Sequence, residues 1–260
     1  MKLTILFLTL LIALSAQDKK GISDFDKARM QAKNRLSQMT NNESILQFIN
    51  LNDVNDPVHG TLRIGDESFE IKEGTVTIKK EVLAKQLSNS VDAYFESKDY
   101  VDKKIRLYHV FGLVDRPVYY VIDKRYPQKV QIVLNWDNRL HNLDLDSHLE
   151  GNDFHVYYRN KKSYGVQGAK VWLNRDVVRS NSYEMITIDK PSQQEVYRYH
   201  VNKYRGPADW KRRAVQVEIY LNGQLERSLL LNENNGASGE NWIVFSLNST
   251  GGLDIIDRVE

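Results

Sequence analysis

The stretch HNLDLDSHLEG, residues 141–151, carries the residue types in this chain that most readily do chemistry. Asp144, Asp146 and His148 occupy every second position, with leucine or serine between them. Because alternate side chains of a β-strand point to one face, a strand would place these three groups together. Neighbouring carboxylates on one face repel each other unless a cation or a basic side chain neutralises them. The pattern therefore indicates a place for a positive charge.

A fourth side chain, His155, joins this face if residues 150–153 form a hairpin turn. We call these four residues the acid–histidine cluster: Asp144, Asp146, His148 and His155. Two imidazoles and two carboxylates suit zinc or another transition metal better than calcium, which prefers oxygen-only shells. This interpretation predicts a divalent metal and either a metal-binding protein or a metal-dependent hydrolase.

A structural role is the alternative interpretation of the acid–histidine cluster. The aspartates would then hydrogen-bond turns or pair with basic neighbours such as Arg139 or Arg159. Clustered charges mark functional sites only statistically. The stretch is not an EF-hand, because Leu149 stands where the required glycine would be. The structural role is preferred, and no cofactor is expected apart from the divalent metal of the first interpretation.

The sequence predicts no catalytic residue. Ser147 and His148 are adjacent, so in a strand their side chains point to opposite faces and cannot form a nucleophile–base pair. There is no G-x-S-x-G elbow and no H-E-x-x-H helix. The chain has no cysteine, which excludes thiolate nucleophiles and thiolate metal sites. A paired-carboxylate glycosidase stays open, since its two acids can come from distant segments, but an enzyme is not indicated.

A second candidate site is the basic segment RYHVNKYRGPADWKRRA, residues 198–214. Arginine and aromatic residues are favoured at binding hot spots, so the segment would suit an acidic glycan or an acidic protein partner. The alternative is a solvated loop, because Asp209 and Glu195 dilute the charge and salt screens the remainder. The ligand-binding candidates of this segment are Arg198, Lys203, Arg205, Trp210, Lys211, Arg212 and Arg213.

The first 17 residues read as a secretory signal peptide, with Lys2, a largely apolar run over 3–14 and small residues near the cleavage site. The run is shorter than the roughly 20 residues that span a bilayer, so cleavage is favoured over a membrane anchor. Removing Lys2 lowers the formal net charge from +2 to +1. This near-neutral balance predicts no nucleic-acid partner, and no later segment predicts membrane insertion. If the host glycosylates secreted proteins, Asn42 and Asn248 lie in acceptor sequons.

The remaining chain predicts an all-β protein of two antiparallel β-sandwiches. Residues 18–55 predict a helical or partly ordered extension, with a short second helix over NNESILQFINLND. Residues 56–126 alternate with a period of two and predict a small β-sandwich. After the polar break DKRYPQ, residues 127–260 predict a larger antiparallel sandwich. Within it, Asn222–Gly223 predicts a type I′ hairpin turn.

Several fragments of the second half carry a family resemblance: VLNW, LDLDSHL, FHVYYRN, YEMITI, VYRYHVNKY, VEIYLNGQ and GENWIVFSL. In order and spacing, about residues 129–256 resemble the YfaP-like domain, a largely uncharacterised β-sandwich of bacterial exported proteins. Many members carry a carboxypeptidase-regulatory-like or transthyretin-like domain where residues 56–126 lie. Many also carry an acidic run ahead of the YEMITI strand, where this chain has WLNRDVVRSNSYE with only Asp176. The resemblance implies fold and export, and no established activity.

Taken together, these patterns predict a secreted, non-catalytic binding or structural protein, located outside the cell or in the lumen of the secretory route. Its expected partner is an extracellular glycan or protein. The alternative is a metal-binding protein or metal-dependent hydrolase that uses the acid–histidine cluster.

Overall fold

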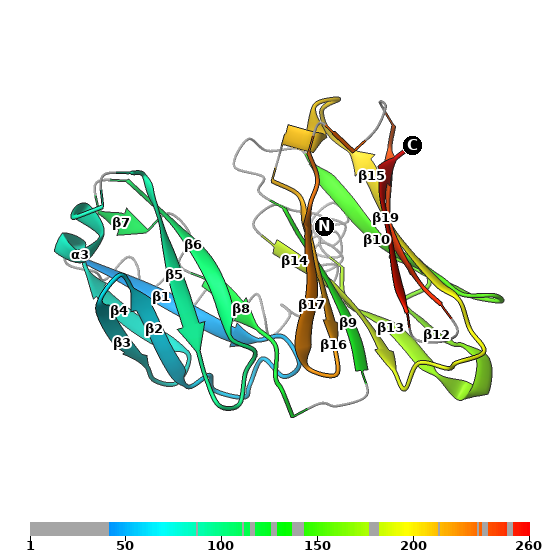
Figure 1. Cartoon of the computed structure of the whole chain (residues 1–260), viewed down its shortest axis with the longest axis horizontal. Helices are drawn as coiled ribbons and strands as arrows, with labels where there is room; N and C mark the ends of the chain where they lie inside the picture. The colour runs from blue at the N-terminus through cyan, green and yellow to red at the C-terminus, as the bar shows by residue number, and fades with distance from the viewer. Residues whose placement is uncertain are drawn as a thin grey trace, which may run out of the picture. The chain divides into compact units, whose positions relative to one another are not determined.

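A computed structural model describes residues 42–260 except 87, 111, 115–117, 126–128, 137–142, 177–181, 213, 233, 236–238 and 249–251, and omits the side chains of 110, 182 and 212. The predicted leader and residues 18–41 lie outside this range. The chain divides into two compact units, one ending at Asp123 and the other spanning Lys124–Glu260. Strands dominate both units (Figure 1), so the all-β prediction is confirmed. The described helices are short: α3 (Lys80–Ala84), η1 (Val166–Gly168) and η2 (Trp210–Arg212).

The first unit contains two sheets around one apolar core. The three-stranded sheet has the order β4 (Thr75–Lys79), β1 (Glu43–Asn50) and β8 (Val118–Val121). The five-stranded sheet has the order β3 (Glu67–Ile71), β2 (Gly60–Ile64), β5 (Ser90–Glu96), β6 (Lys103–Val110) and β7 (Leu113–Val114). Strands β1 and β8 run parallel, which departs from the purely antiparallel arrangement predicted.

Strand β1 corrects the prediction of a second short helix within residues 18–55. Ser44, Leu46 and Phe48 are buried at alternate positions, which is the period of a strand and not of a helix. Both edges of β1 are hydrogen-bonded, one to β4 and the other to β8. A strand in the middle of a sheet is largely buried, so its sequence is rich in apolar residues. Such a short apolar run cannot be distinguished from a buried helix by periodicity alone.

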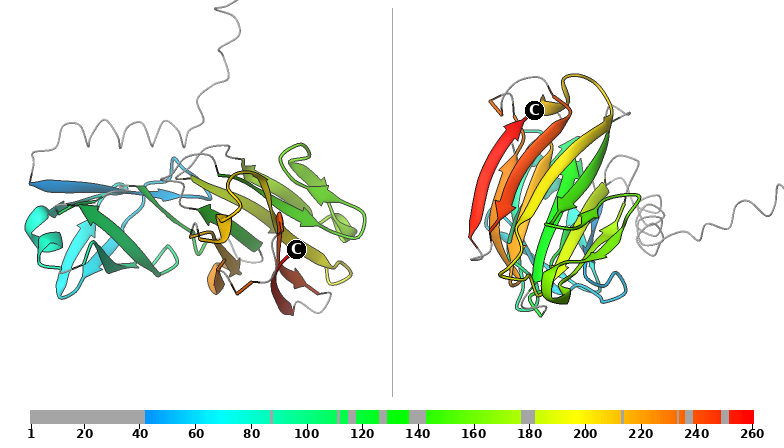
Figure 2. Two further views of the ribbon diagram at one scale, coloured as in Figure 1. Left: turned by 90° about the horizontal axis from the view of Figure 1, so that it is seen from above. Right: turned by 90° about the vertical axis from the view of Figure 1, so that its right-hand side faces the viewer.

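The second unit is a sandwich of two sheets. One sheet has the order β11 (His155–Val156), β10 (Asp144–Glu150), β15 (Tyr197–Arg205), β18 (Asn241–Leu247) and β19 (Leu253–Val259). The other has the order β12 (Lys162–Tyr164), β13 (Lys170–Arg175), β14 (Ser182–Asp189), β9 (Lys129–Trp136), β16 (Gln216–Leu221) and β17 (Gln224–Leu230). The right-hand view of Figure 2 shows β10, β15, β18 and β19 lying side by side.

One apolar core fills this sandwich. Leu145 and Leu149 of β10 and Ile186 of β14 belong to it and are fully buried. The predicted turn between β16 and β17 is confirmed, because Asn222 and Gly223 have φ values of 51° and 73°, as a type I′ turn requires. The core holds β10 of one sheet close to β14 of the other, and the candidate site forms at this contact.

Candidate cation site and histidine cluster

The predicted acid–histidine cluster starts from β10, as expected. Leu145 and Leu149 face the core, so Asp144, Asp146 and His148 share the opposite face of the strand. The predicted hairpin to β11 is confirmed, with Glu150 opposite His155. The four residues nevertheless do not share one site. The aspartates join acidic residues of the other sheet, whereas the two histidines join a third histidine.

Three carboxylates converge from the two sheets of the sandwich. Asp146 of β10, Asp176 just after β13 and Glu184 of β14 each offer one oxygen, and these oxygens lie within 4.8 Å of one another. In the described part of the chain, no other set of three or more acidic or histidine residues meets this criterion. We call the acidic site the group of Asp144, Asp146, Asp176 and Glu184.

Glu184 reaches β10 from within the apolar row of β14. Ile186 and Ile188 share its side of the strand and belong to the core. Its side chain is 1% exposed, and Oε2 accepts a hydrogen bond of 2.7 Å from the backbone N–H of Ser147. A buried carboxylate needs such a donor. The hydrogen bond fixes one Glu184 oxygen at the edge of β10, next to Asp146.

Asp144 has a buried oxygen without a hydrogen-bond donor. The residue is 6% exposed, and Oδ1 accepts no hydrogen bond from any described residue. Burial raises the pKa of Asp144, the positive charge of Arg205 lowers it, and the negative charge of Asp176 raises it again. Asp144 precedes Asp146 by two residues on the same face of β10, so we include it in the acidic site. Leaving a charged carboxylate oxygen buried without a donor is costly, so the site favours either a protonated Asp144 or a bound cation.

The pKa of Asp146 shows the electrostatic cost of the acidic site. Burial, followed by the charges of Asp144 and Asp176, raises this pKa from the ordinary 3.8 to about 6. Asp176 Oδ2 forms an ion pair of 2.7 Å with Lys161 Nζ. The Lys161 side chain is 53% exposed, so solvent screens this ion pair.

The chemistry of the acidic site differs from the predicted one. A shell of carboxylate oxygens suits a hard cation such as calcium or magnesium, whereas the predicted mixed shell suited zinc. Sequence analysis named Asp176 only as the remainder of an acidic run and missed Glu184. A signal for Glu184 was present, since a glutamate in the core-facing row of YEMITI must be buried and needs a partner.

The predicted histidines form a separate group with His200 of β15. His148 Nδ1 and His155 Nε2 are 2.9 Å apart. His200 lies directly opposite His148 in the sheet, and the two rings stack with centroids 4.7 Å apart. Burial, together with the nearby charges of His200 and His155, lowers the pKa of His148 to about 3. We call His148, His155 and His200 the histidine cluster.

Ser147 does not act with a histidine. Its side chain points into the sandwich, where its hydroxyl lies 2.9 Å from the hydroxyl of Tyr199. Burial raises the pKa of Tyr199 well above its ordinary value, so this tyrosine stays neutral. The Ser147–Tyr199 pair is therefore a buried hydrogen bond and not a nucleophile with its base.

The basic segment is divided between surface and core. Arg198 and Arg205 of β15 are exposed, whereas Lys203 is half-buried with Nζ 3.7 Å from Glu240 Oε1. Trp210 is 1% exposed, belongs to the core and donates from Nε1 to the Gly239 carbonyl at 3.2 Å. Its ring therefore cannot stack on a ligand, which corrects its place among the ligand-binding candidates. Lys211 is half-buried, and Arg213 and the side chain of Arg212 lie outside the described residues.

The two sequon asparagines lie in different surroundings. Asn42 is exposed just before β1. Asn248 is half-buried, and its Oδ1 accepts a hydrogen bond of 2.8 Å from the Gly252 N–H. A glycan on Asn248 would have to compete with this turn, whereas Asn42 is open to solvent.

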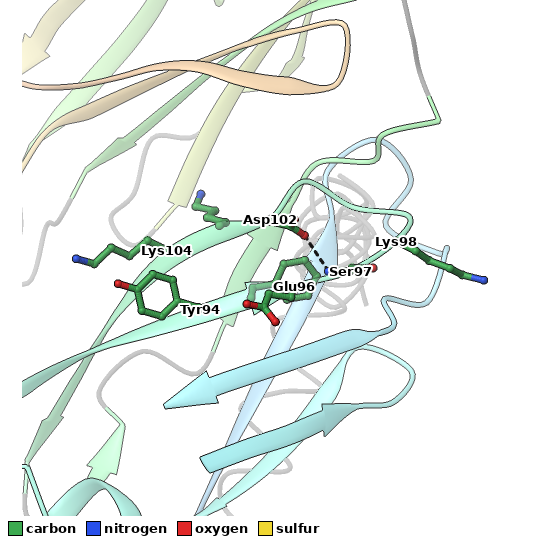
Figure 3. A pocket seen from close by; sticks show the side chains of 8 residues that line it. Tyr94, Glu96, Ser97, Lys98, Asp102 and Lys104 are labelled. Carbon is green, nitrogen blue, oxygen red and sulfur yellow. Dashed lines mark hydrogen bonds between the residues drawn. The ribbon is translucent and has the colours of Figure 1, made fainter. Parts of the chain in front are cut away.

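An open depression of about 590 Å³ lies on the first unit, along β5 and β6. Figure 3 shows Tyr94, Glu96 and Lys104 at its surface and the hydrogen bond from the Ser97 N–H to Asp102 Oδ1, which measures 2.9 Å. Lys104 forms an ion pair with Asp92. The residues that line the depression carry charges of both signs, so the depression favours no particular ligand.

Comparison with family models, curated proteins and solved structures finds no match to this chain. The YfaP-like resemblance therefore stays a prediction from the sequence. Across the part of the chain that the structure describes, there is no helix with the length and apolar character needed to cross a membrane.

Proposed function

We propose that this chain is an exported, non-catalytic protein whose second unit binds a calcium ion at the acidic site. The observation that carries the proposal is the convergence of Asp146, Asp176 and Glu184 within 4.8 Å. The buried, unpartnered Oδ1 of Asp144 supports it independently. The leader-like first 17 residues support export.

Calcium fits the acidic site better than other common metals. Its shell takes six to eight oxygen ligands in flexible geometry, and carboxylates, backbone carbonyls and water supply them. Magnesium requires a tighter octahedron and loses its water slowly, so it rarely occupies a site lined by four carboxylates. Zinc and copper prefer imidazole or thiolate ligands, which this site does not use.

A calcium ion here would stabilise the sandwich and hold its loops. Asp146 belongs to one sheet, whereas Glu184 belongs to the other and Asp176 directly follows β13 of that other sheet. An ion bound to all three carboxylates would therefore link the two sheets where β10 contacts β14. Removing the mutual repulsion of buried carboxylates is the main source of the gain, because these charges have little water to screen them.

Elemental analysis tests the proposal. The purified chain is dialysed to equilibrium against calcium chloride in excess of the expected Kd, and bound calcium is counted per chain as the excess over the outer solution. We expect close to one calcium ion in the wild type and none in Asp176→Asn. Asp153→Asn, which changes an exposed carboxylate in the β10–β11 turn, serves as the matched control and should retain calcium. Wild-type protein without calcium would refute the proposal.

A second candidate function is recognition of an acidic glycan or protein by the end of β15. Tyr204 is 64% exposed and lies between Lys203 and Arg205 in sequence, so an aromatic surface stands among basic groups. Retention on a heparin column tests this function. We expect Arg205→Ser to elute at lower salt than the wild type, with exposed Arg227→Ser of β17 as the control. If the wild type is not retained on heparin, recognition of an acidic glycan by this segment is contradicted.

A further inference from the structure

We infer that the histidine cluster is a second metal site, separate from the acidic site, that takes a copper(II) or nickel(II) ion in square-planar or tetragonal coordination. His148 and His155 supply two adjacent ligand nitrogens, and His200 flanks them. This inference does not depend on the calcium proposal, because it uses different residues and a different class of metal.

The separation of the two nitrogens is compatible with tetragonal coordination. His148 Nδ1 and His155 Nε2 are 2.9 Å apart. Imidazole nitrogens bind metals at about 2.0–2.1 Å, so two ligands at right angles lie about 2.9 Å apart and two tetrahedral ligands about 3.4 Å apart. The observed separation is that of a hydrogen bond between the two rings, and it also equals the spacing of two ligands at a right angle, so a metal can replace the shared proton with little movement of the nitrogens. Tetragonal sites of nitrogen and oxygen ligands are typical of copper(II) and nickel(II).

The remote nitrogen of His148 makes the metal-bound form accessible. His148 Nε2 is buried and has no hydrogen-bond partner among the described residues. A hydrogen-bonded pair of neutral imidazoles holds one proton between its two nitrogens. Metal binding moves this proton to the remote nitrogen of the same ring, so both facing nitrogens offer a lone pair. Only the ring that held the shared proton changes tautomer, and the net charge of the pair does not change.

The surroundings hold the rings in place and accept a positive charge. Tyr157 stacks on His155 with ring centroids 4.4 Å apart, and His200 stacks on His148. Burial lowers the pKa of His200, and the negative charges of Glu150 and Glu260 oppose this lowering. His155 is half-buried on the short strand β11. An ion can therefore reach the pair from solvent and complete its shell with water.

The two sites are neighbours with distinct ligand chemistry. His148 follows Asp146 by two residues on the same face of β10, which places their Cα atoms roughly 7 Å apart. Carboxylate oxygens attract hard cations, whereas imidazole nitrogens attract borderline transition metals. Substitutions at one site should therefore leave the ligands of the other intact.

Electron paramagnetic resonance of copper(II) titrated into the calcium-dialysed full chain tests the inference. We expect one copper per chain with a tetragonal spectrum and couplings from at least two imidazole nitrogens. His155→Gln should weaken copper binding at least tenfold, while the exposed His59→Gln leaves it unchanged. Asp176→Asn, which removes the proposed calcium ligand, should also leave copper binding unchanged.

Two results would overturn the inference. Equal copper affinity in His155→Gln and wild type would place the copper elsewhere, for example at the chain's amino terminus. A wild-type spectrum without imidazole couplings would do the same without relying on any variant. Loss of calcium binding alone would count against the proposed function and not against the histidine site.

Discussion

The backbone N–H of Ser147 donates a hydrogen bond of 2.7 Å to Glu184 Oε2. Ser147 belongs to β10 of the five-stranded sheet, and Glu184 to β14 of the six-stranded sheet. A single side chain thus crosses the sandwich and ends at the backbone of the opposite sheet. Because this contact fixes the Glu184 carboxylate, the acidic site is largely preorganised before any cation arrives.

Calcium should raise the stability of the second unit. A ligand that binds only the folded state at ten times its Kd adds about 1.4 kcal/mol to the free energy of unfolding. Thermal unfolding followed by near-ultraviolet circular dichroism, with calcium and with chelator, measures this gain. Asp176→Asn should lose the gain, and Asp153→Asn should retain it. Equal gains in wild type and Asp176→Asn would argue for binding elsewhere.

Asp146→Asn should stabilise the protein in chelator while abolishing calcium binding. The pKa of Asp146 is raised from 3.8 to about 6, so the folded state binds more protons than the unfolded state between these values. Its contribution to stability therefore falls as pH rises from about 4 to 6, and the charged form remains unfavourable at pH 7. Removing the charge should add on the order of 2 kcal/mol at pH 7.

The measurement for Asp146→Asn is urea unfolding in chelator at pH 4 and at pH 7. The variant should gain stability relative to wild type at pH 7 and gain little at pH 4, where the wild-type carboxyl is already protonated. A variant that is less stable than wild type at pH 7 would mean that Asp146 has a basic partner and no need of a cation.

His148 should make the protein sensitive to acid. Its pKa falls to about 3 in the folded state against an ordinary value of 6.5, so the unfolded state binds more protons between these values. The stability that His148 contributes is complete above pH 6.5 and is lost progressively as pH falls toward 3. His148→Gln should reduce the loss of stability between pH 6.5 and 4.5, measured by urea unfolding, and His59→Gln should not. Parallel pH profiles for wild type and His148→Gln would contradict this assignment.

Trp210 should behave as a core residue. Its side chain is 1% exposed and packs in the core of the second unit. Trp210→Ala should lower the free energy of unfolding by about 3–5 kcal/mol, as is typical for truncation of a buried aromatic ring. Denaturant unfolding measures the loss. A variant of wild-type stability that had lost only heparin retention would restore Trp210 as a ligand-binding residue.

The sequence predicts well those site residues that lie close together along the chain. The alternation of LDLDSHL places Asp144, Asp146 and His148 on one face, and the short turn after Glu150 brings His155 alongside. Both inferences need only the period of a strand and the length of a hairpin. The larger architecture of alternating strands in the second unit follows from the same periodicity.

The remaining half of the site depends on contacts between sheets, which periodicity does not encode. Glu184 follows Asp146 by 38 residues and reaches it only because β14 packs beneath β10. His200 reaches His148 through strand pairing across a long connection. In the first unit, the segment Glu43–Asn50 resembles a short helix in composition, yet its long-range pairing with β8 makes it a strand.

Isothermal titration of calcium into the chelator-treated full chain tests the central claim most directly. We predict one site per chain, with a Kd on the order of 0.1–1 mM, typical of extracellular calcium modules, or tighter. Asp176→Asn should show no binding heat under the same conditions, and Asp153→Asn should match the wild type. Wild-type protein without a saturable calcium isotherm, or an unchanged isotherm in Asp176→Asn, would contradict the account.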